Sequence, residues 1–176
     1  MEAQQAKARK FVLNYGLILG ILLVLLGVIM YVLNYHLKPH WSFMVITFAV
    51  FIAVVVYGIK GYKKENGGFL SIGEAIKVAV GIALIAAIIS GLWVVVLSTI
   101  LEPDYMEQAI ELQKQEAFAN NPALTEEQWE KGLEMSAAFR GPWITFAFTL
   151  VVDMLFGLIV GLIAGAIMKQ RRPYEV

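Results

Sequence analysis

An acidic residue inside an apolar stretch is the first position where this sequence could perform chemistry. Asp153 lies about ten residues into the apolar run 143–168, and a carboxylate inside a bilayer costs several kcal/mol unless it is protonated, paired or hydrated. Such an acid can serve as a proton or ion site, or it can hydrogen-bond to a neighbouring helix. We favour the structural interpretation, because transport normally requires a series of polar groups and Asp153 is isolated.

Two oppositely charged residues, Glu74 and Lys77, lie three positions apart near the start of the apolar run 72–101. Such a pair could gate a path or bind an anionic lipid headgroup. The simpler interpretation is a capping box, in which Ser71 and Glu74 satisfy the first amides of a helix, with a lysine that extends to the membrane interface. We favour the simpler interpretation, and we keep Asp153, Glu74 and Lys77 as the candidate intramembrane polar site.

The remaining reactive residue types do not form a recognisable centre. His36 and His40 are four apart, but Pro39 lies between them and no third ligand is close in the sequence. The chain has no cysteine, and the pair Gly67 and Gly68 is not followed by the Lys-Ser/Thr of a phosphate-binding loop. We therefore expect no catalytic residue, no metal, no cofactor, no nucleic-acid partner and no enzyme activity.

The elements that would position these residues are membrane-spanning helices. The 176 residues are 59% hydrophobic and 16% charged, with a mean hydropathy of +0.70. Four apolar segments, at about 11–33, 42–59, 72–101 and 143–168, are each long enough to cross a bilayer as a helix. We expect an all-α, polytopic membrane protein that forms one membrane domain over residues 1–176.

The distribution of charge predicts how the helices are oriented. Basic residues gather in the two tails and in the loop after the second apolar segment: Lys7, Arg9, Lys10, Lys60, Lys63, Lys64, Lys169, Arg171 and Arg172. The insert 102–140 carries nine acidic residues against three basic ones. The positive-inside rule then places both termini in the cytoplasm and the insert outside it.

The acidic insert is patterned as a helical hairpin. We expect one helix over 104–118, a turn at 120–122, and a second helix over 126–138 that begins with a capping box of Thr125 and Gln128. Trp129 and Leu133 lie four residues apart on the second helix, so they share one face. These two residues are the candidate contact surface for an extracytoplasmic protein partner.

Glycines recur at helical spacing in the first and last apolar segments. Gly157, Gly161 and Gly165 form one line, and a second line consists of Gly16, Gly20 and Gly27. Lines of small residues allow membrane helices to approach closely. The two lines are expected either to face each other and close a four-helix bundle, or to face a second copy in a homo-oligomer; the basic clusters are suited to contact with membrane lipids.

Three stretches carry a resemblance to a known family: 68–77 (GFLSIGEAIK), 101–106 (LEPDYM), and the glycine-rich last span ending in 169–172 (KQRR). In these stretches and in the order of its parts, the chain resembles a family of four-span bacterial membrane proteins of unknown function that is abundant in Bacteroidetes. The resemblance covers nearly the whole chain and implies the bacterial cytoplasmic (inner) membrane. It assigns no catalytic or ligand-binding residue.

Three classes of function are compatible with these patterns. The leading hypothesis is a non-enzymatic scaffold that uses the insert to bind a partner, because the insert is the one large water-exposed feature. The alternative is a small transporter or channel, formed by one chain or by a dimer, with Asp153 in a polar path. An intramembrane enzyme is the least favoured class, since no nucleophile with a base and no set of metal ligands is recognisable.

Overall fold

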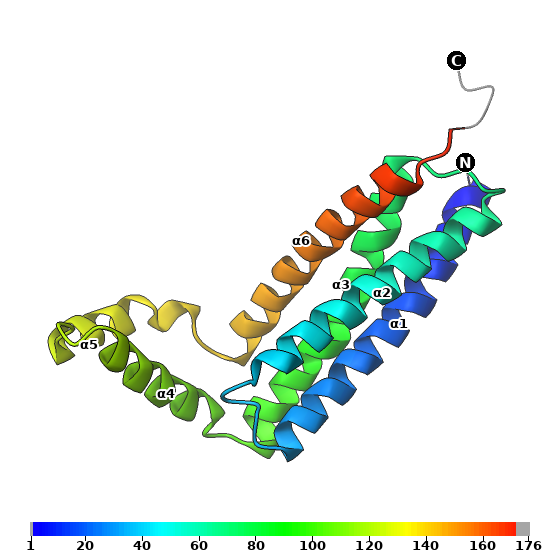
Figure 1. Cartoon of the computed structure of the whole chain (residues 1–176). Coiled ribbons are helices and arrows are strands. Elements are labelled where there is room, and N and C mark those ends of the chain that lie inside the picture. The colour runs from blue at the N-terminus through cyan, green and yellow to red at the C-terminus, as the bar shows by residue number, and fades with distance from the viewer. Residues whose placement is uncertain (1, 172–176) are drawn as a thin grey trace.

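The computed structural model describes residues 2–171, with side chains from residue 8 onward, and shows an all-helical protein (Figure 1). The elements, in order, are α1 (Glu2–Val32), α2 (Trp41–Glu65), α3 (Ile72–Val96), the π-helical turn η1 (Leu97–Leu101), α4 (Tyr105–Asn120), α5 (Glu126–Met135), the 3-10 turn η2 (Ala137–Phe139) and α6 (Pro142–Met168). Of the basic residues above, Arg172 and the side chain of Lys7 lie outside the described part.

Four of these helices are long and apolar enough to span a membrane: Ala8–Val32, Trp41–Glu65, Ile72–Leu101 and Pro142–Met168. The predicted fold class, an all-α polytopic membrane protein, is confirmed. The four helices form a bundle with α1, α2 and α6 arranged around α3 (Figure 1). We call the end with the two chain termini the terminal end, and the end with α4 and α5 the insert end.

The alanine-rich helix α3 is the centre of the bundle. Ala75, Ala79 and Ala83 are fully buried on one side of it, and Val78 and Ile82 are fully buried as well. Side chains this small allow neighbouring backbones to come close, which is the usual basis of helix association in membranes. The core therefore combines close helix contacts at these alanines with large side chains that are fully buried around them, such as Leu19, Ile59 and Leu70.

Both glycine lines pack against α3, so the expectation that they face each other or a second copy was wrong. A methyl group added at Gly157, Gly161 or Gly165 would lie 2.6–2.9 Å from Ala83, Ala79 or Ala75, respectively. Methyl groups at Gly16, Gly20 and Gly27 would instead meet Ile85, Ile89 and Trp93 of α3. The glycines do serve helix packing, but α3 separates the two lines.

The second helix continues past the predicted end of its span. Residues 60–65, which the sequence suggests belong to a glycine-rich turn, are the last residues of α2, and the turn begins only at Asn66. Gly61 lies in this last part of α2, and a Cβ added there would lie 2.7 Å from the ring of Phe11 in α1. This glycine permits close helix packing, whereas the positive φ angles of the turn occur at Gly67 and Gly68.

The terminal end of the bundle is tied together by polar contacts. Leu70 and Gln170 form a single antiparallel bridge, with backbone N···O distances of 3.0 and 2.9 Å. Lys63 Nζ donates to the carbonyl of Met168 at 2.8 Å, which joins the end of α2 to the end of α6. The segment between α2 and α3 is thereby attached to the C-terminal end of α6.

At the insert end, the third span finishes in a π-helical turn. The Ser98 and Thr99 hydroxyls donate back to the carbonyls of Val94 and Val95 at 2.8 and 2.6 Å. The chain then enters the insert, whose two helices and Thr125–Gln128 capping box are present as predicted. The second insert helix is shorter than predicted, because α5 ends at Met135 and only the turn Ala137–Phe139 follows.

Candidate functional site

The insert folds as a hairpin that extends sideways from the insert end of the bundle (Figure 1). The Thr125 hydroxyl accepts from the amide of Gln128 at 3.3 Å, and the Gln128 side chain accepts from the amide of Thr125 at 3.1 Å, so the start of α5 is fixed. Lys114 in α4 and Glu126 in α5 form an ion pair of 2.8 Å across the hairpin. The hydrogen bond and charge of Glu126 raise the pKa of the Lys114 ammonium group.

The predicted contact residues Trp129 and Leu133 point into this hairpin. Trp129 is half-buried against Phe118 of α4, with ring centroids 6.5 Å apart. Both residues line a hollow of about 300 Å³, which we call the hairpin hollow. Its lining consists of Gln113, Leu124, Gln128, Trp129, Gly132, Leu133, Ser136 and Arg140. A partner would reach Trp129 by inserting a side chain, not by resting on an outer face.

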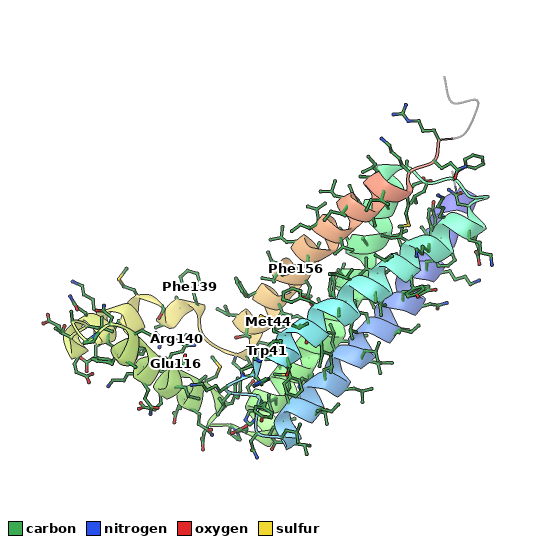
Figure 2. The ribbon with its side chains drawn as sticks, in the orientation of Figure 1. Trp41, Met44, Glu116, Phe139, Arg140 and Phe156 are labelled. Carbon is green, nitrogen blue, oxygen red and sulfur yellow. The ribbon has the colours of Figure 1, made fainter. Side chains whose placement is uncertain are left out.

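Arg140 forms the end of the hairpin hollow. Its guanidinium donates to the carbonyl of Leu133 and to the hydroxyl of Ser136, which fixes the last turn of α5. In Figure 2 Phe139 projects from the edge of the hairpin. Phe139 and Met135 are each 76% exposed, so an apolar edge lies beside the hollow.

A largely buried contact between a histidine and a carboxylate, which sequence analysis missed, anchors the hairpin to the bundle. His36, in the connection between α1 and α2, has its Nε2 atom 2.6 Å from Oε2 of Glu102, and the two side chains are only 9% and 20% exposed. The contact is close but not aligned as a hydrogen bond, and His36 Nδ1 has no hydrogen-bond partner among the described residues. Lys38 and Glu116 form a second, exposed link of 3.0 Å between the same two segments.

Topology could have indicated this pair. His36 follows the first span and Glu102 follows the third, so alternating spans bring both residues to the same end of the bundle. The ring of Tyr105 stacks on His36, with centroids 6.1 Å apart. Burial, and secondly the charge of Glu102, raise the pKa of the Tyr105 phenol above its usual 10.0.

Asp153 lies on the α3 side of α6, one turn before Gly157. Its side chain is half-buried, and no hydrogen bond or ion pair to it is found in the part of the chain that the structure describes. Two hydroxyls of the spans that could serve as partners bond within their own helices instead: Ser90 donates to the carbonyl of Ala87, and Thr149 donates to the carbonyl of Thr145. The predicted hydrogen bond to another helix is therefore not formed by these residues.

Glu74 and Lys77 occupy different surroundings at the terminal end. The carboxylate of Glu74 accepts from the amide and hydroxyl of Ser71 at 2.8 and 2.9 Å, which completes the predicted capping box. It also accepts from the hydroxyl of Tyr62 at 3.1 Å and from the amide of Asn66 at 3.4 Å. Lys77 is exposed. Glu74 therefore holds α2 and α3 together, far along the bundle from Asp153.

The geometry does not support a metal site at His36 and His40. Among the side chains of residues 8–171, no three His, Cys, Asp or Glu residues gather as metal ligands. His40 caps α2 by accepting from the amide of Ser42 at 3.4 Å, while His36 is engaged with Glu102. The two histidines thus have separate structural contacts.

Fold and site together define an all-α polytopic membrane protein with four helices of spanning length and one helical hairpin. A family model described as "Protein of unknown function (DUF4199)" matches residues 14–170, and the chain belongs to that family. No curated protein and no solved structure matches the chain.

Proposed function

We propose that this protein is a non-enzymatic membrane scaffold that binds a partner protein through the hairpin hollow. The observation that carries the proposal is the hollow itself, in which Trp129 and Leu133 are accessible between two helices that extend away from the bundle. Aromatic side chains in such pockets contribute a large share of binding energy at protein interfaces. The remaining surface of the hairpin is acidic, which suits a partner with basic residues around an apolar side chain.

The proposal includes location and orientation. Basic residues at the terminal end and acidic residues at the insert end support a cytoplasmic position for the termini. The hairpin would then face the extracytoplasmic side of a bacterial inner membrane. No cofactor and no catalytic step are part of this proposal.

The test is photo-crosslinking in native membranes with a benzoyl-phenylalanine at Gln128, on the rim of the hollow, and at Glu107, on the exposed face of α4, as control. We expect one specific protein adduct at Gln128 and none at Glu107. Gly132→Leu should abolish the adduct by filling the hollow, since a Cβ at Gly132 meets nothing within 4 Å. Ala119→Leu, at an exposed position of α4, should leave the adduct in place. An adduct that survives Gly132→Leu would refute the role of the hollow.

A second candidate function is transport of a proton or small ion through Asp153. The observation that favours it is a half-buried carboxyl group in a span with no protein partner among the described residues. In liposomes, Asp153→Asn should then change a measurable flux, while Thr149→Val should not. Absence of flux for the wild-type protein across protons, alkali cations and halides would eliminate this candidate.

A further inference from the structure

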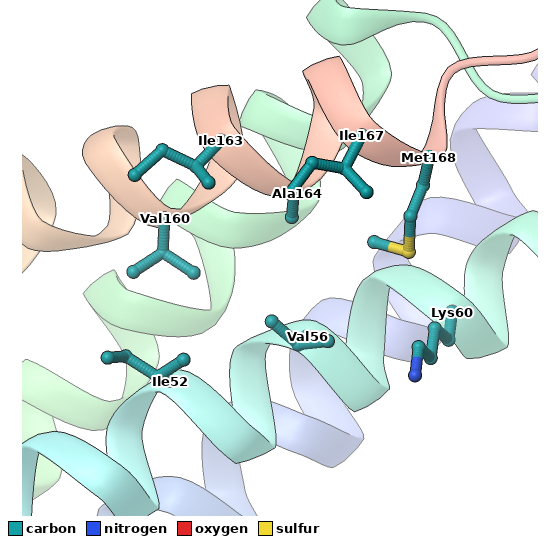
Figure 3. Close-up of a pocket in the computed structure, with 8 residues that line it drawn as sticks. All are labelled: Ile52, Val56, Lys60, Val160, Ile163, Ala164, Ile167 and Met168. Carbon is teal, nitrogen blue, oxygen red and sulfur yellow. The ribbon is translucent and has the colours of Figure 1, made fainter.

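An apolar groove runs along the outside of the bundle between α2 and α6 (Figure 3). It has a volume of about 420 Å³, and its lining is aliphatic except for one lysine. The lining residues are Ile52, Val56, Lys60, Val160, Ile163, Ala164, Ile167 and Met168. Ile163 and Ile167 are 57% and 78% exposed, so the groove opens toward the surroundings of the bundle.

Contacts between α2 and α6 close the groove at both ends. Toward the middle of the bundle, the ring of Phe156 lies 5.1 Å from Phe48 and 6.4 Å from Phe51, measured between centroids. At the terminal end, Lys63 bonds to the carbonyl of Met168. The two helices therefore touch above and below the groove and leave a bounded space between these contacts.

The length of the groove matches one leaflet of a bilayer. Ile52 and Lys60 are eight residues apart on α2, which corresponds to about 12 Å along the helix axis. Half of a hydrocarbon core of about 30 Å is about 15 Å. The groove thus extends from the interface at the terminal end toward the bilayer midplane, whereas a helix of a second copy would need a contact surface along the whole span.

The terminal end of the groove is positively charged. Lys60 is exposed, and no carboxylate pairs with it among the side chains of residues 8–171. Lys64, Lys169 and Arg171 are exposed at the same end. A lysine whose stem lines an apolar surface can extend its ammonium group to the level of the headgroups. The charge of the groove is therefore complementary to an anionic headgroup.

We propose that this groove binds one acyl chain of an anionic phospholipid from the leaflet at the terminal end, with the lipid phosphate beside Lys60. The aliphatic walls hold the chain, Phe156 and Phe48 limit its depth, and Lys60 selects the charge of the headgroup. The inference is independent of the partner-binding hairpin, which lies at the opposite end of the bundle.

The charge is tested by native mass spectrometry of the full chain with dioleoyl phosphatidylglycerol and dioleoyl phosphatidylcholine. We expect one tightly bound phosphatidylglycerol and a weaker phosphatidylcholine. Lys60→Gln should lower the affinity for phosphatidylglycerol about fivefold, as expected for one lysine near the membrane surface. The affinity for phosphatidylcholine should stay unchanged. Lys131→Gln, an exposed lysine of α5 at the opposite end of the bundle, is the control and should change neither. Equal binding of the two lipids by the wild type, or an unchanged Lys60→Gln, would overturn the proposal.

The role of the groove is tested by filling it with a larger side chain. Val56→Phe places a ring in the groove and should remove the single tightly bound lipid of either class, whereas Val45→Phe, on the exposed surface of the same helix, should not. Val56→Phe that retains the lipid would refute the site. The site would also be refuted if Val56→Phe turned a dimer into a monomer without removing a lipid, because the occupant of the groove would then be a second copy.

Discussion

At the scale of single residues, Tyr105 reports on the buried contact between the hairpin and the bundle. Its pKa is raised because the phenolate would be buried and would lie near the charge of Glu102. Below the usual pKa the phenol is neutral in both the folded and the unfolded protein, so it adds no pH dependence. As the pH rises past 10.0, the unfolded chain ionises first, and stability is lost until the folded pKa is passed.

The prediction can be checked by titrating the seven tyrosines to alkaline pH and following the absorbance of the phenolates. The difference between wild type and Tyr105→Phe should show one phenol that ionises above pH 10. In Glu102→Gln the pKa of Tyr105 should fall but stay above the usual value, because burial is the larger cause. A Tyr105 that titrates at its ordinary pKa in the wild type would mean that the hairpin attachment opens in solution.

Asp153 gives a residue-scale prediction on stability. A half-buried carboxyl group without a protein partner is a cost in an apolar span, so Asp153→Leu should stabilise the bundle by about 1 kcal/mol or more. The thermal midpoint in detergent should rise by about 2–4 °C per kcal/mol. Thr149→Val, one turn away, serves as the control and should change the midpoint less. A lower midpoint for Asp153→Leu would indicate that a bound ion or water stabilises the carboxylate.

At the scale of helices, the contact of α6 with α3 depends on the absence of side chains on the glycine line. A Cβ at Gly161 would lie 2.8 Å from Cβ of Ala79 and 3.0 Å from Cα of Ile76, so relief requires movement of backbone. Gly161→Ala should therefore destabilise the bundle by about 1–3 kcal/mol in thermal unfolding. Gly73→Ala, where a Cβ meets nothing within 4 Å, should leave stability unchanged or slightly higher. Equal effects of the two substitutions would contradict the packing.

The spans and the hairpin could be predicted from the sequence because each depends on local patterns. An apolar segment of spanning length must be helical in a bilayer, and the capping residues Ser71 and Thr125 indicate where two of the helices begin. These signals require no knowledge of neighbouring helices. The folded protein therefore has helices that begin where these local patterns predict.

The packing partners could not be predicted, because a line of glycines permits close approach without specifying what approaches. Gly157 and Gly16 fit the same description in the sequence, yet they contact opposite sides of α3. Gly61 likewise resembles a turn glycine until the ring of Phe11 is placed beside it. The groove was missed for a related reason, since Val56 and Val160 border an empty space only when α2 and α6 are both positioned.

At the scale of the whole molecule, the hairpin and the bundle are nearly independent. The hairpin is attached by its two chain connections, by the buried pair of His36 and Glu102, and by the exposed pair of Lys38 and Glu116. Replacing residues 104–138 with a flexible Gly-Ser linker should thus preserve the helicity of the bundle in circular dichroism. The loss of His36–Glu102 burial should lower its thermal midpoint only modestly. An unfolded product would show that the hairpin is part of the bundle rather than an attached module.

The orientation of the molecule determines which compartment the hairpin faces and which leaflet supplies a lipid to the groove. Because the chain contains no cysteine, single cysteines can be introduced without background. In sealed right-side-out vesicles, a membrane-impermeant maleimide should label Lys38→Cys and Glu107→Cys at the insert end, and should label Lys64→Cys and Lys169→Cys only after permeabilisation. The reverse pattern would place the basic residues outside, against the positive-inside rule. It would also move the proposed partner of the hairpin into the cytoplasm and the anionic lipid into the outer leaflet. Labelling at both ends in every vesicle would contradict a single orientation.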